Sequence, residues 1–176
     1  KAMNLDYIYV DKGNDIASLI EAFEKVKDTK KAVVVHINTL KGKGYAPAEQ
    51  NKEEWHWHMP FDIATGESLS KGGEPDFADA SLEYLLKKMD EDKSVVAITA
   101  GTPTVMGFTA DMRAKAGKQF VDVGIAEETA VALASGIAAN GGKPVFGVYS
   151  SFIQRAYDQI TQDVGINANA VTFAVF

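Results

Sequence analysis

Residues 32–37 read Ala-Val-Val-Val-His-Ile, a run in which four of the six side chains are β-branched. Such a run is typical of a strand buried on both faces of a parallel sheet, with His36 as a core histidine. Residues 6–10 have the character of a second short strand. Between the two strands, an amphipathic helical stripe is formed by Ile16, Leu19, Ile20 and Phe23. We therefore expect a βαβ unit over residues 6–37, with Asn14 as the N-cap of its helix.

Residues 38–75 have a different character, since they are rich in glycine and proline and keep no sustained period. An irregular stretch of this length is uncommon inside a compact domain, and it is usually a functional loop or a linker. We expect residues 41–75 to link two partial domains, 1–40 and 76–176, and to carry an active-site loop at the front end.

From residue 76 onward, helical and β-branched segments alternate. The expected helices are 76–90, 105–115, 127–139 and 151–163, and the expected strands are 95–98, 120–123, 144–149 and 171–176. This alternation predicts an α/β fold with doubly wound parallel sheets. The helix at 127–139 is rich in small residues that allow another backbone to approach closely, which favours a homodimer.

The composition excludes several classes of function. The chain has 176 residues, 46% of them hydrophobic and 24% charged, which argues against disorder. It contains no cysteine, so disulfides and a cysteine nucleophile are excluded. Its net charge of −6 argues against nucleic acid as a partner. No apolar run reaches the roughly 18 residues of a membrane helix, so no membrane partner is expected. The absence of cysteine is compatible with a reducing cytoplasm, where we expect the protein.

Three segments fall at the carboxyl ends of predicted strands, where doubly wound sheets bind ligands. They are Lys41–Tyr45, residues 122–128 and residues 149–155. Each also has a plain structural interpretation. Lysines and glycines form solvated loops, Glu127 can cap the helix that it opens, and Arg155 can pair with Asp158. The His56 and His58 pair has no evident third metal ligand, so no metal site is predicted.

Several runs resemble 1-deoxy-D-xylulose-5-phosphate synthases, which are transketolase-like enzymes dependent on thiamine diphosphate. The matching runs are "LKGKGYAPAE" at 40–49, "FDIATG" at 61–66, "FVDVGIAEE" at 120–128, "GGKPVFGVYSSFIQRAYDQITQDVGI" at 141–166 and "VTFAV" at 171–175. Of these, "YSSFIQRAYDQ" is the most specific. The resemblance runs through nearly the whole chain.

The resemblance implies a role for six residues. Tyr45 matches a tyrosine that contacts the cofactor, and Phe152 matches the aromatic residue that packs on its pyrimidine ring. Glu127 matches the catalytic glutamate that bonds the pyrimidine N1′. Tyr149 and Arg155 match positions near the phosphate of the acceptor aldehyde. In the linker, His56 matches a histidine that faces the reacting centre.

The resemblance also implies the reaction, in which pyruvate loses carbon dioxide and condenses with glyceraldehyde 3-phosphate. The product, 1-deoxy-D-xylulose 5-phosphate, serves isoprenoid and thiamine biosynthesis. A carboxyl group at N1′ favours the imino tautomer that accepts the thiazolium C2 proton, so Glu127 is expected to be at least partly buried. Mg²⁺ is implied as well. The family's Gly-Asp-Gly motif for it does not occur in these residues, so its ligands are expected outside them.

The sequence departs from the family pattern at two positions beside Glu127. The family continues Ala-Glu-Gln-His-Ala, and this chain has Glu128 and Thr129 in place of the glutamine and histidine. A threonine cannot transfer protons as an imidazole does, which bears on acceptor preference or rate. Two alternatives stay open. One is another transketolase-like enzyme or a 2-oxo acid dehydrogenase subunit, and the other is a truncated, non-catalytic domain that only binds or assembles.

Overall fold

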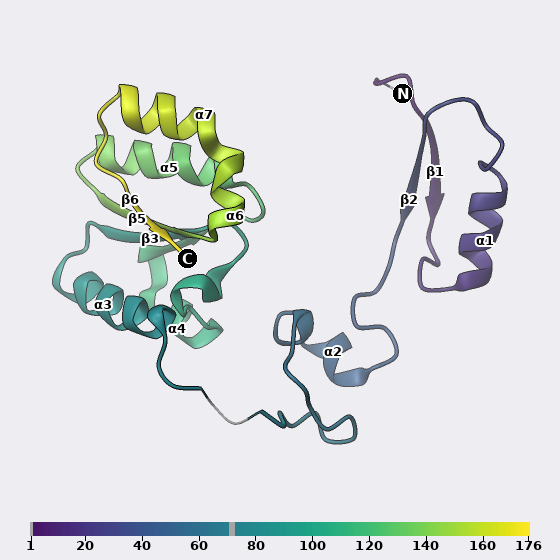
Figure 1. Cartoon of the computed structure of the whole chain (residues 1–176), viewed down its shortest axis with the longest axis horizontal. Helices are drawn as coiled ribbons and strands as arrows, with labels where there is room; N and C mark the ends of the chain where they lie inside the picture. The colour runs from purple at the N-terminus through teal and green to yellow at the C-terminus, as the bar shows by residue number, and fades with distance from the viewer. Residues whose placement is uncertain (1, 71–72) are drawn as a thin grey trace. The chain divides into compact units, whose positions relative to one another are not determined.

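The computed structural model describes residues 2–70 and 73–176, and the chain divides into two compact units (Figure 1). The N-terminal unit comprises residues 1–72 and the C-terminal unit residues 73–176. Both units combine helices with parallel strands, which confirms the predicted fold class.

The N-terminal unit begins with the expected βαβ arrangement. Strand β1 (Asp6–Val10) pairs in parallel with β2 (Val33–Ile37), and α1 (Ile16–Glu24) connects them. The N-cap prediction was wrong by one residue. Asp15, and not Asn14, caps α1, because its carboxylate accepts the Ser18 N–H at 2.8 Å. The Asn14 side chain is thereby left for another contact.

The prediction that β2 is buried on both faces was also wrong. Burial alternates along the strand, and Val34 and His36 are exposed. The reason is that α1 covers only one face of this two-stranded sheet (Figure 1). His36 is no core histidine, since its Nδ1 lies 2.6 Å from the Tyr7 hydroxyl on the open face.

The segment after β2 has more regular structure than its composition indicates. It contains α2 (Ala46–Gln50) and a 3₁₀ turn (Glu54–His56). A single antiparallel bridge joins Phe61 to Ser68. Pro47 suits the first turn of α2, because a proline there lacks only an N–H that the helix would leave unpaired. Lys71 and Gly72, within the predicted linker, lie outside the described residues.

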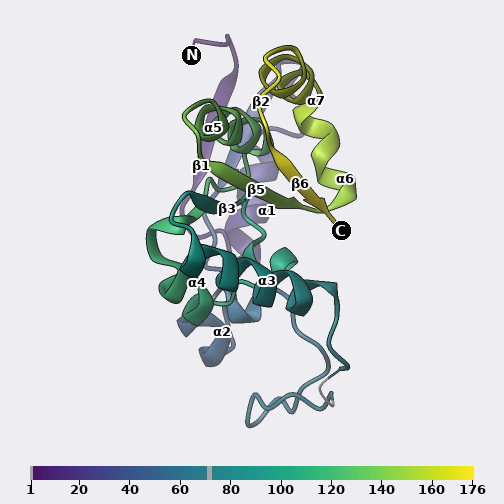
Figure 2. The same ribbon diagram turned by 90° about the vertical axis from the view of Figure 1, so that its left-hand side faces the viewer.

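The C-terminal unit is a four-stranded parallel sheet in the order β4-β3-β5-β6. The strands are β3 (Val95–Thr99), β4 (Phe120–Asp122), β5 (Lys143–Val148) and β6 (Thr172–Val175). Helices α3 (Phe77–Glu91) and α4 (Ala110–Ala116) cover one face, and α5 (Glu127–Ala139) and α7 (Tyr157–Gln159) cover the other (Figures 1 and 2). The chain leaves β3 and β5 in opposite directions, so the point of reversal lies between these two strands.

The sheet of the C-terminal unit has a separate hydrophobic core on each face. On the α5 face, Ile98 and Phe146 pack with Val131 of the helix. On the α3 face, Met106 and Phe108 pack with residues of α3. Burial of such side chains contributes about 1.5–3 kcal/mol each, and this fixes the strands whose carboxyl ends carry the candidate site.

Two expected helices are broken. The one expected over 105–115 stops at Gly107 (φ 77°), which separates a 3₁₀ turn (Pro103–Met106) from α4. The one expected over 151–163 consists of α6 (Ser150–Ile153), a 3₁₀ turn (Gln154–Ala156), α7 and a π-helical segment (Ile160–Ile166). Within the described ranges, no helix has the length and apolar character needed to cross a bilayer.

Candidate active site

The turn after β4 places Glu127 at the carboxyl edge of the sheet, and hydrogen bonds to Asp122 stabilise this turn. Asp122 ends β4, and its Oδ1 accepts the Gly101 N–H at 2.8 Å and the Gly124 N–H at 2.9 Å. One carboxylate therefore ties together the turns that follow β3 and β4. Gly124 has φ 73°, a conformation that favours glycine. Three residues later the chain enters α5, with Glu127 as the first residue of the helix.

The Glu127 side chain is buried, and its charged partner is Arg155. Glu127 is 2% exposed, which agrees with the expected burial. Its Oε2 lies 3.0 Å from Arg155 Nη1, at ion-pair distance. The same oxygen has no hydrogen-bond partner, so the guanidinium approaches it without the alignment of a hydrogen bond. Of the two interpretations that the sequence left open for Arg155, the structure shows a contact with Glu127 in place of a structural pairing with Asp158.

Tyr149 and Phe152 lie at the same edge, where β5 leads into α6. Their rings are in edge-to-face contact, with centroids 5.7 Å apart and planes at 87°. Phe152 keeps 41% of its surface exposed, so an aromatic face remains available to a flat ligand. The structure thus brings Glu127 to Arg155 and Tyr149 to Phe152, all after strands β4 and β5.

Tyr45 belongs to an aromatic cluster in the N-terminal unit. Its ring meets Trp55 edge-on at 5.0 Å and lies 5.8 Å from Phe61. Its hydroxyl is buried and has no hydrogen-bond partner. A side chain at Gly66 would meet that hydroxyl at 3.4 Å, so the backbone there closes the cluster.

His56 ends the 3₁₀ turn next to the aromatic cluster. Its ring is exposed, and Lys41 Nζ contacts its Nδ1. Within the N-terminal unit, the structure therefore joins His56 to the Lys41–Tyr45 loop, a contact that the sequence pattern did not indicate.

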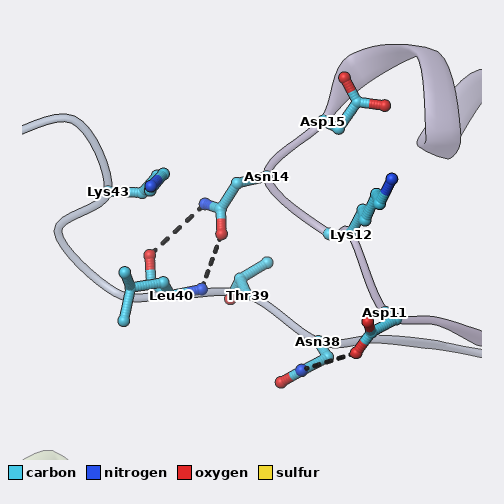
Figure 3. Close-up of a pocket in the computed structure, with 9 residues that line it drawn as sticks. Asp11, Lys12, Asn14, Asp15, Asn38, Thr39, Leu40 and Lys43 are labelled. Carbon is cyan, nitrogen blue, oxygen red and sulfur yellow. Dashed lines mark hydrogen bonds between the residues drawn. The ribbon is translucent and has the colours of Figure 1, made fainter.

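A cavity of about 540 Å³ opens at the carboxyl ends of β1 and β2 (Figure 3). Its lining residues come from two chain segments: Asp11, Lys12, Gly13, Asn14, Asp15, Asn38, Thr39, Leu40 and Lys43. Of these residues, the sequence predicted only Lys43 in a candidate ligand-binding segment. Asn14 of the first segment was expected as a helix N-cap, so a role for that segment in the cavity was missed. A larger cavity of about 690 Å³ lies at the amino ends of β3 and β5, and it holds none of the predicted site residues.

Two buried side-chain atoms among the described residues lack any hydrogen-bond partner, the Tyr45 hydroxyl and Glu127 Oε2. A buried polar atom without a hydrogen bond costs about 1–3 kcal/mol, and such atoms are rare. The Arg155 ion pair offsets this cost for Glu127 Oε2 but not for the Tyr45 hydroxyl. Both belong to residues that the resemblance assigns to the cofactor. The same described ranges hold no group of three side chains that could bind a metal ion.

Comparisons with known proteins follow the same division of the chain. Residues 73–176 match the family described as the transketolase pyrimidine-binding domain. The chain is 45% identical to 1-deoxy-D-xylulose-5-phosphate synthase 2 of Geobacter sulfurreducens over 99% of its own length and 28% of that protein. It is 38% identical to the Aquifex aeolicus 1-deoxy-D-xylulose-5-phosphate synthase, over 98% of its own length and 27% of that protein. The chain thus spans just over a quarter of the length of these curated relatives.

Proposed function

The chain belongs to the transketolase pyrimidine-binding domain family, and from this premise we propose that it is part of a thiamine-diphosphate-dependent 1-deoxy-D-xylulose-5-phosphate synthase. The names of its relatives support the proposal. The observation that carries it is that the two buried side-chain atoms without a hydrogen-bond partner, the Tyr45 hydroxyl and Glu127 Oε2, both lie on residues matched to the cofactor. We also propose that residues 1–40 end the diphosphate-binding domain, 41–75 link the two domains, and 76–176 begin the pyrimidine-binding domain.

The described residues fit thiamine diphosphate chemically. Glu127 Oε2 would accept a proton from, or share one with, the pyrimidine N1′, and the buried hydroxyl of Tyr45 would donate to a polar atom of the cofactor. The half-exposed ring of Phe152 would pack on the pyrimidine. When bound, the cofactor supplies the electron sink for decarboxylation, while the protein orients it and holds the proton at N1′.

The proposed substrates are pyruvate and glyceraldehyde 3-phosphate. Arg155 is 47% exposed at its side chain, so its guanidinium can receive a phosphate in bidentate geometry while it remains near Glu127. Tyr149 is the residue before α6, and its hydroxyl would donate to the same phosphate. His56, whose Nδ1 is contacted by Lys41, would face an oxygen at the reacting centre.

This chain differs from the family pattern at two positions, and we expect both differences to change its preference for the acceptor aldehyde. Glu128 is half-buried and Thr129 is exposed, directly after the catalytic Glu127. Glu128 adds a negative charge where the acceptor phosphate would approach, and Thr129 removes an imidazole. We propose that these two residues lower the affinity for phosphorylated acceptors relative to enzymes that carry glutamine and histidine.

We further propose a homodimer in the cytoplasm. Helix α5 presents an exposed stripe of small residues, formed by Thr129, Ala132, Gly136 and Ala139. Small side chains at such spacing allow a second helix to approach closely, next to the turn that carries Glu127. Mg²⁺ is proposed from the family resemblance alone, with ligands outside this chain, and no step is assigned to it.

The test is carbon dioxide release by the complete gene product. With pyruvate, glyceraldehyde 3-phosphate, thiamine diphosphate and Mg²⁺, we expect release that depends on both substrates and on the cofactor. The matched control is Glu127→Gln, which keeps the shape of the side chain and removes its charge. Absence of release by the wild-type protein would refute the proposed function.

A further inference from the structure

Asn14 connects the turn after β1 to the segment that leaves β2. The Leu40 N–H donates to Asn14 Oδ1 at 2.7 Å, and Asn14 Nδ2 donates to the Leu40 carbonyl at 3.4 Å. Figure 3 shows the side-chain amide bridging the cavity to both backbone groups of Leu40. One side chain therefore pairs with Leu40 as a neighbouring strand would, beyond the end of the ladder.

The backbone on both sides of this bridge approaches closely. The Asn38 N–H donates to the Val10 carbonyl at 2.9 Å, and the Gly13 N–H donates to the Asn38 carbonyl at 2.9 Å. A Cβ at Gly13 would lie 2.3 Å from that carbonyl oxygen and 2.5 Å from Ile37 Cγ2. Only glycine fits there, so the turn is held against the exit of β2 at a fixed separation.

The constraint continues from Leu40 to Tyr45. The Lys43 N–H donates to the Leu40 carbonyl at 3.2 Å, and the Tyr45 N–H donates to the Gly42 carbonyl at 3.1 Å. Gly42 packs so closely on Ala48 that a Cβ would meet the Ala48 backbone at 2.7 Å. Asn14 thus holds the start of the loop and α2 holds its end. The position of Tyr45, the last residue of the loop, depends on both.

We propose that Asn14 is a positioning residue that sets the conformation of the Leu40–Tyr45 loop and, through it, the approach of Tyr45 to the cofactor. The part concerning the cofactor rests on the proposed function. Asn14 does not cap α1, because Asp15 does, so both atoms of its amide serve Leu40. Asn14 acts through the backbone of Leu40. Its removal lowers the fraction of molecules in which the Leu40–Tyr45 loop has the conformation seen in the structure.

Backbone amide exchange in the cofactor-free complete gene product tests the loop directly. Asn14→Leu has similar size and removes both hydrogen bonds, and we expect exchange at residues 40–45 to quicken about fivefold to tenfold. Asn14→Asp retains the acceptor for the Leu40 N–H and should quicken exchange less. The matched control is Asn140→Leu, which removes a side-chain bond to Gly136 in the C-terminal unit. Unchanged exchange at 40–45 in Asn14→Leu would overturn the proposal.

Protection of the β1 and β2 amides in the same experiment shows that the unit is folded. If Asn14→Leu loses that protection, Asn14→Asp decides the result, because it keeps the shorter of the two bonds. The proposal would also be overturned by two results together. Asn14→Asp would exchange at the wild-type rate, and Asn14→Ala would protect the Leu40 N–H as strongly as the wild type does.

The second measurement is a calorimetric titration with thiamine diphosphate and Mg²⁺. We expect Asn14→Leu to weaken binding about tenfold, while turnover at saturating cofactor stays within twofold of wild type. Faster loop exchange with unchanged affinity would overturn the positioning of Tyr45 and leave the proposed function intact. A wild-type protein that binds no thiamine diphosphate would instead refute the proposed function, and the exchange data would still report on the loop.

Discussion

Arg155 Nη1 lies 3.0 Å from Glu127 Oε2, yet the oxygen receives no hydrogen bond. The carboxylate is buried and the guanidinium is half-exposed. The cation therefore offsets the charge of Glu127 while the lone pairs of Oε2 stay available. A ligand that brings an N–H to this oxygen would satisfy it without displacing the arginine.

Glu127→Gln should lower cofactor-dependent turnover by at least about 100-fold, because the amide cannot hold the proton at N1′. The midpoint of thermal unfolding should change little, since the half-exposed Arg155 can be solvated after the carboxylate is lost. Steady-state rates and thermal melts of the complete gene product measure both effects. Glu83→Gln, at an exposed position of α3, serves as the control and should keep its turnover; an equal loss there would contradict the assignment.

Tyr45→Phe should have opposite effects on stability and on binding. Removing a buried hydroxyl that has no partner should raise the unfolding free energy of the cofactor-free protein, by up to about 1–3 kcal/mol. Loss of one donor to the cofactor should weaken binding about tenfold, equivalent to roughly 1.4 kcal/mol. Calorimetry and denaturant melts test the two parts. Unchanged affinity would show that the hydroxyl makes no contact with the cofactor.

The helix that carries Glu127 shows what the sequence could predict. It was expected over residues 127–139 and forms over that range, because a helical pattern depends on local spacing. The exposed face of β2 was missed, because a run of β-branched residues does not say how many layers cover it. The breaks in the helices after β3 and β5 depend on a left-handed glycine and on packing that no short-range pattern encodes.

The contacts of the candidate site were less predictable than its members. Arg155 could pair with Asp158 by helical spacing, and it meets Glu127 instead. The sheet places β4 and β5 on either side of β3, so the segments that follow these two strands begin at the same edge. The contact of Asn14 with Leu40 links residues 26 positions apart. Neither contact has a signature in the sequence, since each depends on the pairing of strands.

Asp92 should make the C-terminal unit sensitive to acid. The Lys143 ammonium at 2.7 Å and bonds from Ser94 hold the pKa of this carboxyl well below its usual value of 3.8. A depressed pKa in the folded state means that the stabilisation is present above about pH 4 and is lost as the pH falls below it. Asp92→Ala should therefore melt at a lower temperature than wild type at pH 7.

The difference between Asp92→Ala and wild type should shrink as the pH is lowered from 4 towards 2, as followed by thermal melts in low salt. Glu91→Gln, which breaks the exposed ion pair with Lys88, is the control and should have little effect at any pH. A difference for Asp92→Ala that stays constant across this range would show that the carboxylate charge is not what stabilises the unit.

Gly136→Leu should dissociate the proposed homodimer. The leucine side chain would project from the exposed small-residue stripe of α5 and prevent a second helix from approaching. Sedimentation velocity of the complete gene product should show the mass halved, with circular dichroism unchanged. Ala110→Leu, an equal enlargement at an exposed position on α4, should leave the dimer intact. A dimer that survives Gly136→Leu would place the interface elsewhere.

The edge position of β6 has a practical consequence for anyone who produces this chain. Among the described residues β6 pairs with β5 alone, so in a protein made of these 176 residues one side of its backbone presents unpaired donors and acceptors. Its neighbourhood reads Val-Thr-Phe-Ala-Val-Phe at 171–176, without a charge or a proline. A segment of this kind is a template for intermolecular strand addition and cross-β aggregation. Thr172→Lys would place a positive charge at an exposed position of β6. This charge should oppose strand addition and improve solubility.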